Sequence, residues 1–378
     1  MNSKLNKKKL FVLISVILVL ILFMIFSILY SKNASVRVFF DKYIFRKNIT
    51  EGTLPEIPYG DSNIFTFDNH IISLENNILT FYNKSASEAF SMEIEISNPI
   101  FEACGKYLCI AEKNGSKLYL IQNRNIVWQK DVEGHISNIS LNKNGYVAIC
   151  VSDTSYKTIC KLFSNTGSEL FTTFLSRAYV IDSAISNDNK YLALAEVDSS
   201  GVSVSSSVKL ISIDNAINDN INSIQYNHIA PTDSLIVNIG FNNNNLVCIY
   251  DNHIDVICDN SYNEISNFEN TNVIFADINN KLIQIEKKST GLFSSEFELQ
   301  IINTKDQNKK IYTLQKEPKS LQVFEDIIAI NFGTEALFIN NNSWLIKDYT
   351  ASQEINSIIL SDNLAGIIFK DKIEFLSL

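Results

Sequence analysis

From about residue 54 to the C-terminus, the sequence repeats sets of short apolar runs at a spacing of roughly 42 residues. The first runs of these sets begin near residues 62, 98, 136, 179, 235, 272, 321 and 355. Clusters of Asn, Asp, Gly and Ser separate the runs, which indicates short β-strands joined by turns. Four strands in each set of about 42 residues are typical of β-propeller blades. We therefore predict an all-β fold in which residues 54–378 form a β-propeller.

The second run of each set is apolar at nearly every position. The clearest examples are KYLCIAE from Lys106, GYVAICV from Gly145, KYLALAEV from Lys190 and NLVCIYD from Asn245. A strand with one face in water alternates polar and apolar residues, whereas a strand between two packed layers is apolar on both faces. These runs are therefore predicted to be central blade strands. Aligned as written, they place Cys109 and Cys248 where other sets have Ala, which indicates small core residues.

The number of sets favours eight blades. The last set supplies only three strands, and a strand near residues 53–59 would complete it. Closing the ring in this way removes sheet edges that would otherwise invite aggregation. Seven blades with one irregular excursion is the alternative, and a pair of β-sandwiches is a third arrangement.

Residues 10–30, LFVLISVILVLILFMIFSILY, form an apolar run of 21 residues without a charge. A helix of that length spans about 30 Å, the thickness of the hydrocarbon core of a membrane. Secretory signals have a shorter apolar core of about 7 to 15 residues and a small-residue cleavage site. We predict an uncleaved transmembrane helix, with a cleaved signal or a lipoprotein anchor as the alternative.

Basic residues flank this helix on both sides. Lys4, Lys7, Lys8 and Lys9 precede it, and the positive-inside rule places such residues in the cytoplasm. Residues 1–9 are thus predicted to be a cytoplasmic tail, and the propeller to lie outside a single-pass cell-membrane anchor. Residues 31–53 are also basic, which weighs against this orientation. Their apolar residues have helical spacing, so this segment is expected to be an amphipathic helix or a stalk.

The charge is distributed unevenly along the chain. Residues 1–50 contain nine Lys or Arg and one acidic residue, which leaves 23 basic and 40 acidic residues for the remainder. An acidic body repels phosphate backbones. We therefore expect membrane lipid to contact the N-terminal anchor and a protein or envelope partner to contact the propeller, and no nucleic acid to bind.

Several segments resemble known propellers. SNDNKYLALAEVD resembles a turn and strand of WD40-like and lactonase-like propellers, and NRNIVWQKDVEG, NTGSELFTTF and NNSWLIKDYT are similar to the outer-strand motif of quinoprotein-like propellers. With the apolar helix, GKYLCIAEKNG and NGYVAICVSDTSYK, the chain resembles an uncharacterised clostridial-type family, a domain of unknown function in single-span membrane proteins. The resemblance covers most of residues 55–378 and implies a fold but no reaction. Only Trp128 and Trp344 match the quinoprotein tryptophan, so no cofactor is expected.

Six Cys and four His are the candidate metal or redox residues. No C-x-x-C occurs, which argues against a zinc ribbon or a thioredoxin-type site. Cys150 with Cys160, and Cys248 with Cys258, are each ten residues apart across a predicted hairpin, so cross-strand disulfides stay open. His70, His135, His228 and His253 show no ligand spacing. His253 is predicted to lie in a hairpin turn, with a surface metal site beside Asp251 and Asp255 as the alternative.

The stretch DSAISNDNKYLALAEVDSSG, residues 182–201, contains four carboxylates that suggest a cluster. Asp188 falls in the turn before the second strand and Asp198 begins the next turn, while Glu196 aligns with Glu112. We therefore interpret the stretch as a turn, a central strand and a second turn, and place the functional question on the axial loops.

No hydrolase elbow, Walker loop or dinucleotide-binding glycine motif is present. The sequence therefore names no catalytic, cofactor-binding or metal-ligating residue, and we predict a non-enzymatic binding or scaffolding module. The alternative is a propeller enzyme of the lactonase, cyclase or glycan-processing type, with an axial carboxylate or metal site assembled from single residues on several blades.

Overall fold

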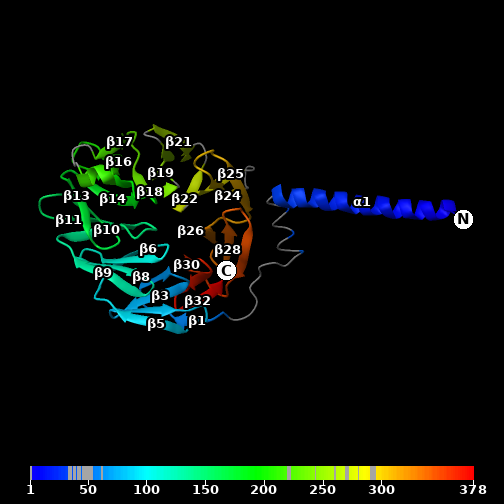
Figure 1. The fold of residues 1–378 in the computed structure, drawn as a ribbon, viewed down its shortest axis with the longest axis horizontal. Coiled ribbons are helices and arrows are strands. Elements are labelled where there is room, and N and C mark those ends of the chain that lie inside the picture. Colours follow the sequence, from blue (N-terminus) through cyan, green and yellow to red (C-terminus); the bar gives the residue numbers. More distant parts are fainter. Residues whose placement is uncertain are drawn as a thin grey trace.

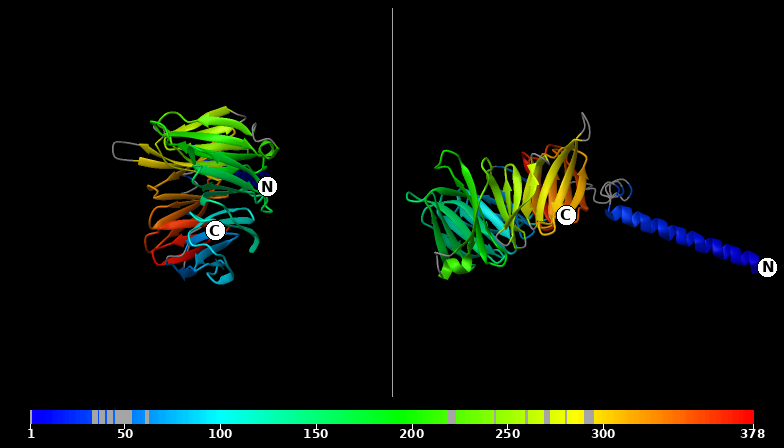
Figure 2. Two further views of the ribbon diagram at one scale, coloured as in Figure 1. Left: turned by 90° about the vertical axis from the view of Figure 1, so that its left-hand side faces the viewer. Right: turned by 90° about the horizontal axis from the view of Figure 1, so that it is seen from above.

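The computed structural model describes residues 2–32, 36, 40, 44, 54–60, 63–218, 223–242, 244–258, 261–268, 272–279, 281–289 and 295–378. Within these ranges, 32 strands form eight antiparallel sheets of four strands each. Figure 1 shows the sheets arranged around a central axis, with helix α1 extending away from the ring, and Figure 2 shows the same ring from two further sides. The predicted eight-bladed propeller is confirmed, and the seven-bladed and sandwich alternatives are excluded.

We number the blades in chain order. Blade 1 contains β2 (Asn63–Phe67), β3 (His70–Glu75), β4 (Ile78–Tyr82) and β5 (Glu88–Glu93), and blade 2 contains β6 (Pro99–Cys104), β7 (Tyr107–Glu112), β8 (Lys117–Gln122) and β9 (Asn125–Asp131). Blade 3 contains β10 (His135–Leu141), β11 (Val147–Ser152), β12 (Thr158–Phe163) and β13 (Glu169–Leu175). Blade 4 contains β14 (Ala178–Ile185), β15 (Tyr191–Asp198), β16 (Ser205–Ser212) and β17 (Ile224–Ile229). A short helix, α3 (Ile213–Asn218), follows β16.

The second half of the ring follows the same order. Blade 5 contains β18 (Ile236–Asn242), β19 (Asn245–Tyr250), β20 (His253–Cys258) and β21 (Ser261–Asn267). Blade 6 contains β22 (Val273–Asn279), β23 (Lys281–Ser289), β24 (Ser295–Ile302) and β25 (Lys309–Leu314). Blade 7 contains β26 (Ser320–Phe324), β27 (Ile327–Asn331), β28 (Glu335–Asn340) and β29 (Leu345–Thr350). Blade 8 contains β30 (Ser357–Ser361), β31 (Leu364–Ile368) and β32 (Lys372–Ser377), with β1 (Glu56–Pro58) as its fourth strand.

Strand β1 closes the ring. It pairs antiparallel with β32 through three residue pairs, of which Ile57 with Ile373 is the central one. Ile57 is buried among Ile71 of blade 1 and Ile368 and Phe375 of blade 8. The predicted closing strand near residues 53–59 is therefore confirmed, and it joins the two ends of the repeat without leaving an unpaired edge on β32.

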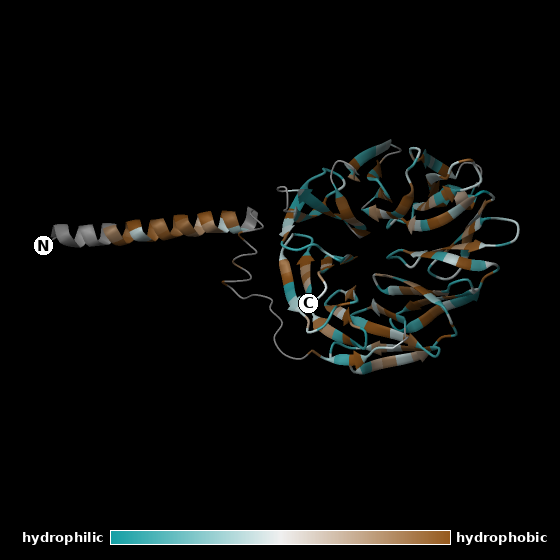
Figure 3. Cartoon of the chain, turned by 180° about the vertical axis from the view of Figure 1, so that it is seen from behind, coloured by the Kyte–Doolittle hydropathy of each residue, from teal (hydrophilic) through white to brown (hydrophobic). Residues whose placement is uncertain are grey.

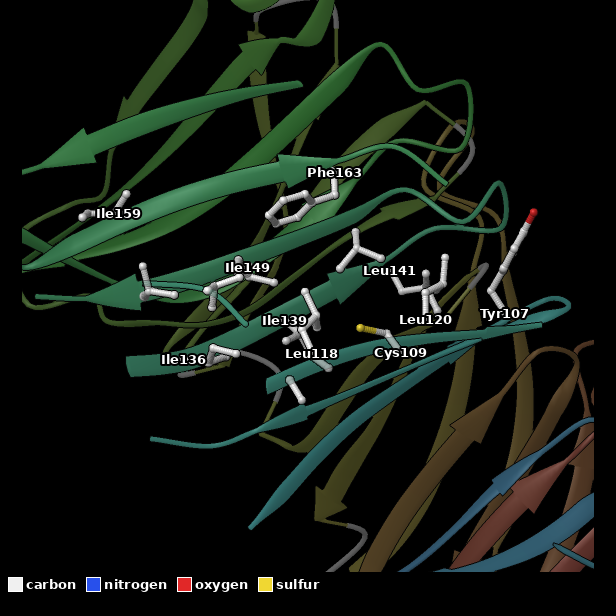
Figure 4. Packing of buried hydrophobic residues seen from close by; sticks show 14 residues of the cluster. Tyr107, Cys109, Leu118, Leu120, Ile136, Ile139, Leu141, Ile149, Ile159 and Phe163 are labelled. Atoms are coloured by element: carbon white, nitrogen blue, oxygen red, sulfur yellow. The ribbon is translucent and has the colours of Figure 1, made fainter. Parts of the chain in front are cut away.

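Apolar side chains on both faces of the central strands form the cores between blades. Figure 4 shows the core between blades 2 and 3, where Cys109 and Leu120 lie against Leu141, Ile149 and Phe163. This arrangement explains why the second strands are apolar at nearly every position, since each face contacts a different neighbouring blade. The prediction of sandwiched central strands is confirmed.

The alignment of Cys248 with Cys109 is wrong by one residue. Leu108 and Leu246 both contact the preceding blade. Cys109 follows Leu108 directly and contacts the next blade, whereas Cys248 lies two residues after Leu246 and contacts the preceding one. Side chains alternate along a strand, so a shift of one residue reverses the face that each side chain occupies. Both thiols are nevertheless small core groups.

The N-terminal helix α1 (Asn2–Lys32) contains an apolar stretch, Phe11–Tyr30, that is long enough to cross a membrane and exposed on all sides. Figure 3 shows this stretch as mostly hydrophobic, with a few paler positions. Length and composition fit a membrane anchor or a signal sequence equally. Most of the predicted amphipathic segment or stalk, residues 31–53, lies outside the described residues, and the domain boundaries at residues 9, 30 and 53 stay predictions.

Candidate functional site: the axial cavity

The first strand of each blade lies next to the axis, where it contacts the first strands of the neighbouring blades. Because every blade repeats the same strand order, these first strands begin at one face of the ring and end at the other. We call these the strand-start face and the strand-end face. The connections between blades and the turns between second and third strands lie at the strand-start face.

Four consecutive first strands carry a bulge at the same place. The pairing with the second strand shifts by one residue after Ile136 in β10, Val180 in β14, Ile236 in β18 and Val273 in β22. A bulge bends the strand and redirects the side chains next to it. In blades 4 and 5 the residues directly after the bulge are Asp182 and Asn238, and both line a cavity at the axis.

The axial cavity has a volume of about 310 Å³. It is lined by the strand-end halves of first strands and by the turns that follow them, from blades 2 to 7. The polar lining residues are Glu102, Ser140, Asn142, Asp182, Ser183, Asn187, Asn238 and Glu325, and the larger apolar ones are Leu141, Ile185, Ile239, Phe241, Ile278 and Phe324. The lining contains carboxylates but no Lys, Arg or His among the described residues.

Asp182 is held in a fixed position by backbone amides. Its Oδ1 accepts the N–H of Ser183 at 2.8 Å, and its Oδ2 accepts the N–H of Ile239 in the next blade at 2.9 Å. Burial raises the pKa of Asp182 from its ordinary value to about 6, although the two amide hydrogen bonds oppose this shift. The side chain therefore remains ionised at neutral pH.

Glu102 is the second carboxylate of the cavity. Its Oε2 accepts the N–H of Leu141 in the next blade at 3.0 Å. Burial, assisted by the nearby charge of Asp182, raises the pKa of Glu102 to about 8, and the Leu141 amide only partly offsets this. At neutral pH the cavity therefore contains one neutral carboxylic acid and one carboxylate. Such a pair has the protonation states that general acid and base catalysis requires.

Two more polar groups of the cavity lack partners. Ser140 is only 2% exposed, and its hydroxyl makes no hydrogen bond with any described residue. The side chain of Asn238 likewise has no partner within the described ranges. In ring order, Glu102, Ser140, Asp182 and Asn238 come from blades 2, 3, 4 and 5. Four adjacent blades thus contribute one polar group each.

Asp182 corrects our interpretation of residues 182–201. Asp188 does lie in the turn, where its Oδ1 accepts the Ser186 hydroxyl at 2.8 Å, and Asp198 ends β15 and accepts the Ser200 amide. Glu196 is buried against Lys209 at 2.7 Å. These three confirm the structural interpretation, but Asp182 belongs to the axial cavity. The first residue of the stretch is therefore part of the candidate site that we had placed elsewhere.

His253 is buried at the start of a strand, and its prediction as a residue of the hairpin turn is wrong. The turn consists of Asp251 and Asn252, and His253 begins β20 with 4% of its surface exposed. Its ring stacks on Tyr250 at 4.2 Å, and its Nε2 lies 3.3 Å from Asp255. The described residues include no group of three His, Cys, Asp or Glu that could hold a metal ion.

His228 of blade 4 approaches the same carboxylate from across the blade interface. Its Nε2 lies 3.6 Å from Asp255. Burial lowers the pKa of His228, although the charge of Asp255 opposes this shift. A neutral imidazole in this position packs between blades 4 and 5. The grouping of His228, His253 and Asp255 is therefore explained by packing between the blades.

The two predicted cysteine pairs have different outcomes. Cys150 and Cys160 are directly opposite in β11 and β12, and their sulfurs are 2.9 Å apart as free thiols. Cys248 is opposite Asp255 rather than Cys258, so the second proposed pairing is wrong. The intervening turn shifts the register enough to separate these two side chains.

A second surface feature lies on the strand-start face of blades 3 to 6. Ten large apolar side chains among the described residues are exposed there: Tyr156, Phe174, Tyr179, Ile181, Val202, Val204, Ile229, Leu235, Val237 and Ile274. We call this set the apolar face. Single exposed hydrophobic residues are normal, but a group on one side of four adjacent blades is typical of an interaction surface.

With this geometry established, the chain can be compared with known proteins. The sequence profile of DUF5711, a family of unknown function, matches residues 45–378. The chain belongs to DUF5711. This confirms the resemblance to an uncharacterised family, which here has an eight-bladed propeller and an N-terminal apolar helix. No curated protein matches the chain.

Solved structures share the fold of this DUF5711 member at low sequence identity. BamB from Moraxella catarrhalis is 10% identical with a TM-score of 0.50, and the match covers 87% of this chain and 99% of BamB. The dihydro-heme d1 dehydrogenase NirN, in complex with DHE, is 10% identical with a TM-score of 0.52, covering 91% of this chain and 81% of NirN. At this identity the likeness extends to the fold alone.

Proposed function

We propose that this DUF5711 protein is a membrane-anchored binding or scaffolding module whose propeller lies outside the cell membrane and contacts an envelope protein. The observation that carries the proposal is the apolar face. Exposed apolar side chains that gather on one side of a protein are typical of a protein–protein contact site. The helix at Phe11–Tyr30 would hold the propeller near the membrane, and the acidic body disfavours nucleic acid and anionic lipid as the partner.

Two residues of the apolar face that lie on adjacent first strands are the best targets for substitution. Ile181 and Val237 are the bulge residues of adjacent first strands, and both are exposed. The double variant Ile181→Asp, Val237→Asp should reduce crosslinking to the partner in intact cells by about tenfold or more, because charges in an apolar contact are desolvated without compensation. Quantitative mass spectrometry of crosslinked membranes measures this loss.

Ile217→Asp is the matched control for this experiment. Ile217 is an exposed apolar residue of α3, at the opposite face of blade 4. We expect Ile217→Asp to leave the crosslinked species unchanged. Equal recovery of the same partners by both variants would contradict docking through the apolar face.

The orientation of the propeller has its own test. In intact cells, an added protease should cleave exposed loops such as the one that contains Val202, which is fully exposed between β15 and β16. A cysteine reporter placed in residues 1–9 should stay inaccessible to a membrane-impermeant thiol reagent. A propeller that is protected until the membrane is permeabilised would contradict the extracytoplasmic assignment.

A propeller enzyme is the second candidate, and one observation favours it. Glu102 and Asp182 lie in the same cavity with pKa values of about 8 and about 6, which suits them to act as acid and base. Hydrolysis of dihydrocoumarin or nitrophenyl glycosides by the purified chain, lost in Asp182→Asn, would support this candidate. Within the described residues, no group of three His, Cys, Asp or Glu is placed to hold a metal ion for this reaction.

A further inference from the structure

We propose that the axial cavity binds a small ligand that carries a protonated amine on a short apolar body. This inference goes beyond the proposed partner contact, because the cavity lies at the axis and is lined by the strand-end halves of the first strands, whereas the apolar face lies on the opposite side of the ring. The volume of about 310 Å³ is in the range of small-molecule sites.

Three groups of the cavity that can accept hydrogen bonds lie on three successive blades. Glu102 and Asp182 come from blades 2 and 4, and Ser140 lies on blade 3 between them. An ammonium group has three donors and no acceptor, so it can be satisfied by two carboxylates and a hydroxyl. Hydrogen bonds between an ammonium and a carboxylate are also among the stronger ones in proteins.

An unpartnered group indicates that this set of three is incomplete without a ligand. Ser140 is 2% exposed and lines the cavity, yet no described residue bonds its hydroxyl. Ser140 Oγ is not one of the fully buried polar atoms without a partner, so it is accessible from the cavity and available to a ligand. This observation is independent of the carboxylates, because it concerns a neutral side chain on a different blade.

A positive charge that balances the carboxylates of the cavity must come from outside the lining residues. Buried carboxylates are ordinarily paired with a cation, and the described lining residues include no Lys, Arg or His. Lys143 lies near enough to influence Cys104, but its side chain is exposed in the turn after β10. A cationic ligand would supply the counter-charge within the cavity.

The other lining residues are mostly apolar, so they suit an organic molecule better than a bare metal ion. Ile239 and Leu141 donate backbone amides to the two carboxylates and are themselves buried apolar side chains. Phe241, Ile278 and Phe324 continue this apolar wall. No group of three His, Cys, Asp or Glu that could hold a metal ion is present within the described ranges. An alkyl chain next to the ammonium group would contact these side chains.

Binding of the amine should be linked to proton release. In the empty cavity Glu102 retains its proton up to about pH 8 because of burial and the charge of Asp182. A bound ammonium stabilises the ionised form, so affinity should rise between pH 6 and pH 9. The other ionisable groups nearby are Cys104 and Glu325 in the lining, exposed Lys143, and Asp277 on β22, whose pKa is also raised by burial.

Calorimetric titration of the full chain in detergent micelles tests this proposal with n-butylamine, n-butanol and calcium chloride as probes. Butylammonium should bind at least about tenfold more tightly than butanol, which has the same alkyl chain without the charge. Asp182→Asn should weaken butylammonium binding by about tenfold or more, and Ser140→Ala by about threefold, since a charged partner contributes more than a neutral one.

Asp198→Asn is the control, because Asp198 is a half-buried carboxylate at the end of β15 and outside the cavity. The affinity of the Asp198→Asn variant for butylammonium should equal that of the wild type. Glu102→Gln serves as a further cavity variant if Asp182→Asn fails to fold. Equal affinities for butylamine and butanol, equal effects of the cavity and control substitutions, or calcium binding that displaces butylammonium would each overturn the proposal. None of these results depends on the envelope partner.

Discussion

Ile57→Ala should open the propeller. Strand β1 is held to β32 by only three residue pairs, and Ile57 is its one buried side chain, with 9% of its surface exposed. Truncating a buried Ile to Ala costs about 2 to 5 kcal/mol. Because β1 also covers the edge of β32, we expect both a lower midpoint of urea unfolding and increased association of the protein, measured by fluorescence and size-exclusion chromatography.

A neighbouring substitution separates closure from a general surface effect. Glu56 pairs with Lys372 at 2.8 Å, but its side chain is 53% exposed. Exposed ion pairs contribute about 0 to 1 kcal/mol, so Glu56→Gln should leave the unfolding midpoint and the elution volume nearly unchanged. If Ile57→Ala behaves like Glu56→Gln, then the ring does not depend on β1 for closure.

Glu102→Gln should make the protein more stable at alkaline pH. Burial raises the pKa of Glu102 from its ordinary 4.5 to about 8. Between these two values the folded state holds a proton that the unfolded state has released, so stability falls as pH rises through this window and levels off above pH 8. A difference of one pKa unit corresponds to about 1.4 kcal/mol, so the difference between 4.5 and about 8 corresponds to a total effect of about 5 kcal/mol.

Urea unfolding at pH 5 and at pH 9 measures this effect. Gln is neutral and its amide oxygen can still accept the Leu141 amide, so the gain of the variant over the wild type should be small at pH 5 and largest at pH 9. Glu93→Gln, an exposed carboxylate at the end of β5, should show no such dependence. A Glu102→Gln variant that is destabilised equally at both pH values would show that Glu102 is not a buried acid.

Much of the fold could be predicted because its information is local and repeated. The apolar central runs identify β7, β11, β15 and β19 one by one, and the three strands of the last set require a fourth from the N-terminus. The face occupied by Cys248 was harder to predict, because a shift of one residue in alignment is nearly invisible when both faces of a strand are apolar.

The candidate site depends on information that is not local. Glu102, Ser140 and Asp182 are about 40 residues apart along the chain, and each resembles an ordinary strand or turn residue in its own segment. Only the packing of neighbouring blades around the axis brings them to one cavity. A polar residue directly after a bulge is the one signal in the sequence, as in IDS at residues 181–183 and VNI at residues 237–239, but the bulge itself is recognised only from the pairing.

His253 also has an environment that its own segment of sequence does not reveal, but here the residue is buried where a turn was expected. Asp251, Asn252 and His253 have the composition of a turn, yet the ring of His253 lies between Tyr250 and the carboxylate of Asp255. Local composition indicated exposure, whereas packing against the neighbouring blade buries the side chain. Contacts between blades therefore decide the environment of polar residues that local propensity assigns to the surface.

The position of β1 also has a mechanical consequence. The covalent path from α1 enters the propeller through the strand that completes blade 8. Any tension along the anchor is therefore borne first by the three residue pairs between β1 and β32, before it reaches another blade. Attachment and closure share one short segment, so a force strong enough to strip β1 from β32 would lengthen the tether and open the ring in a single event, while the chain stays covalently attached.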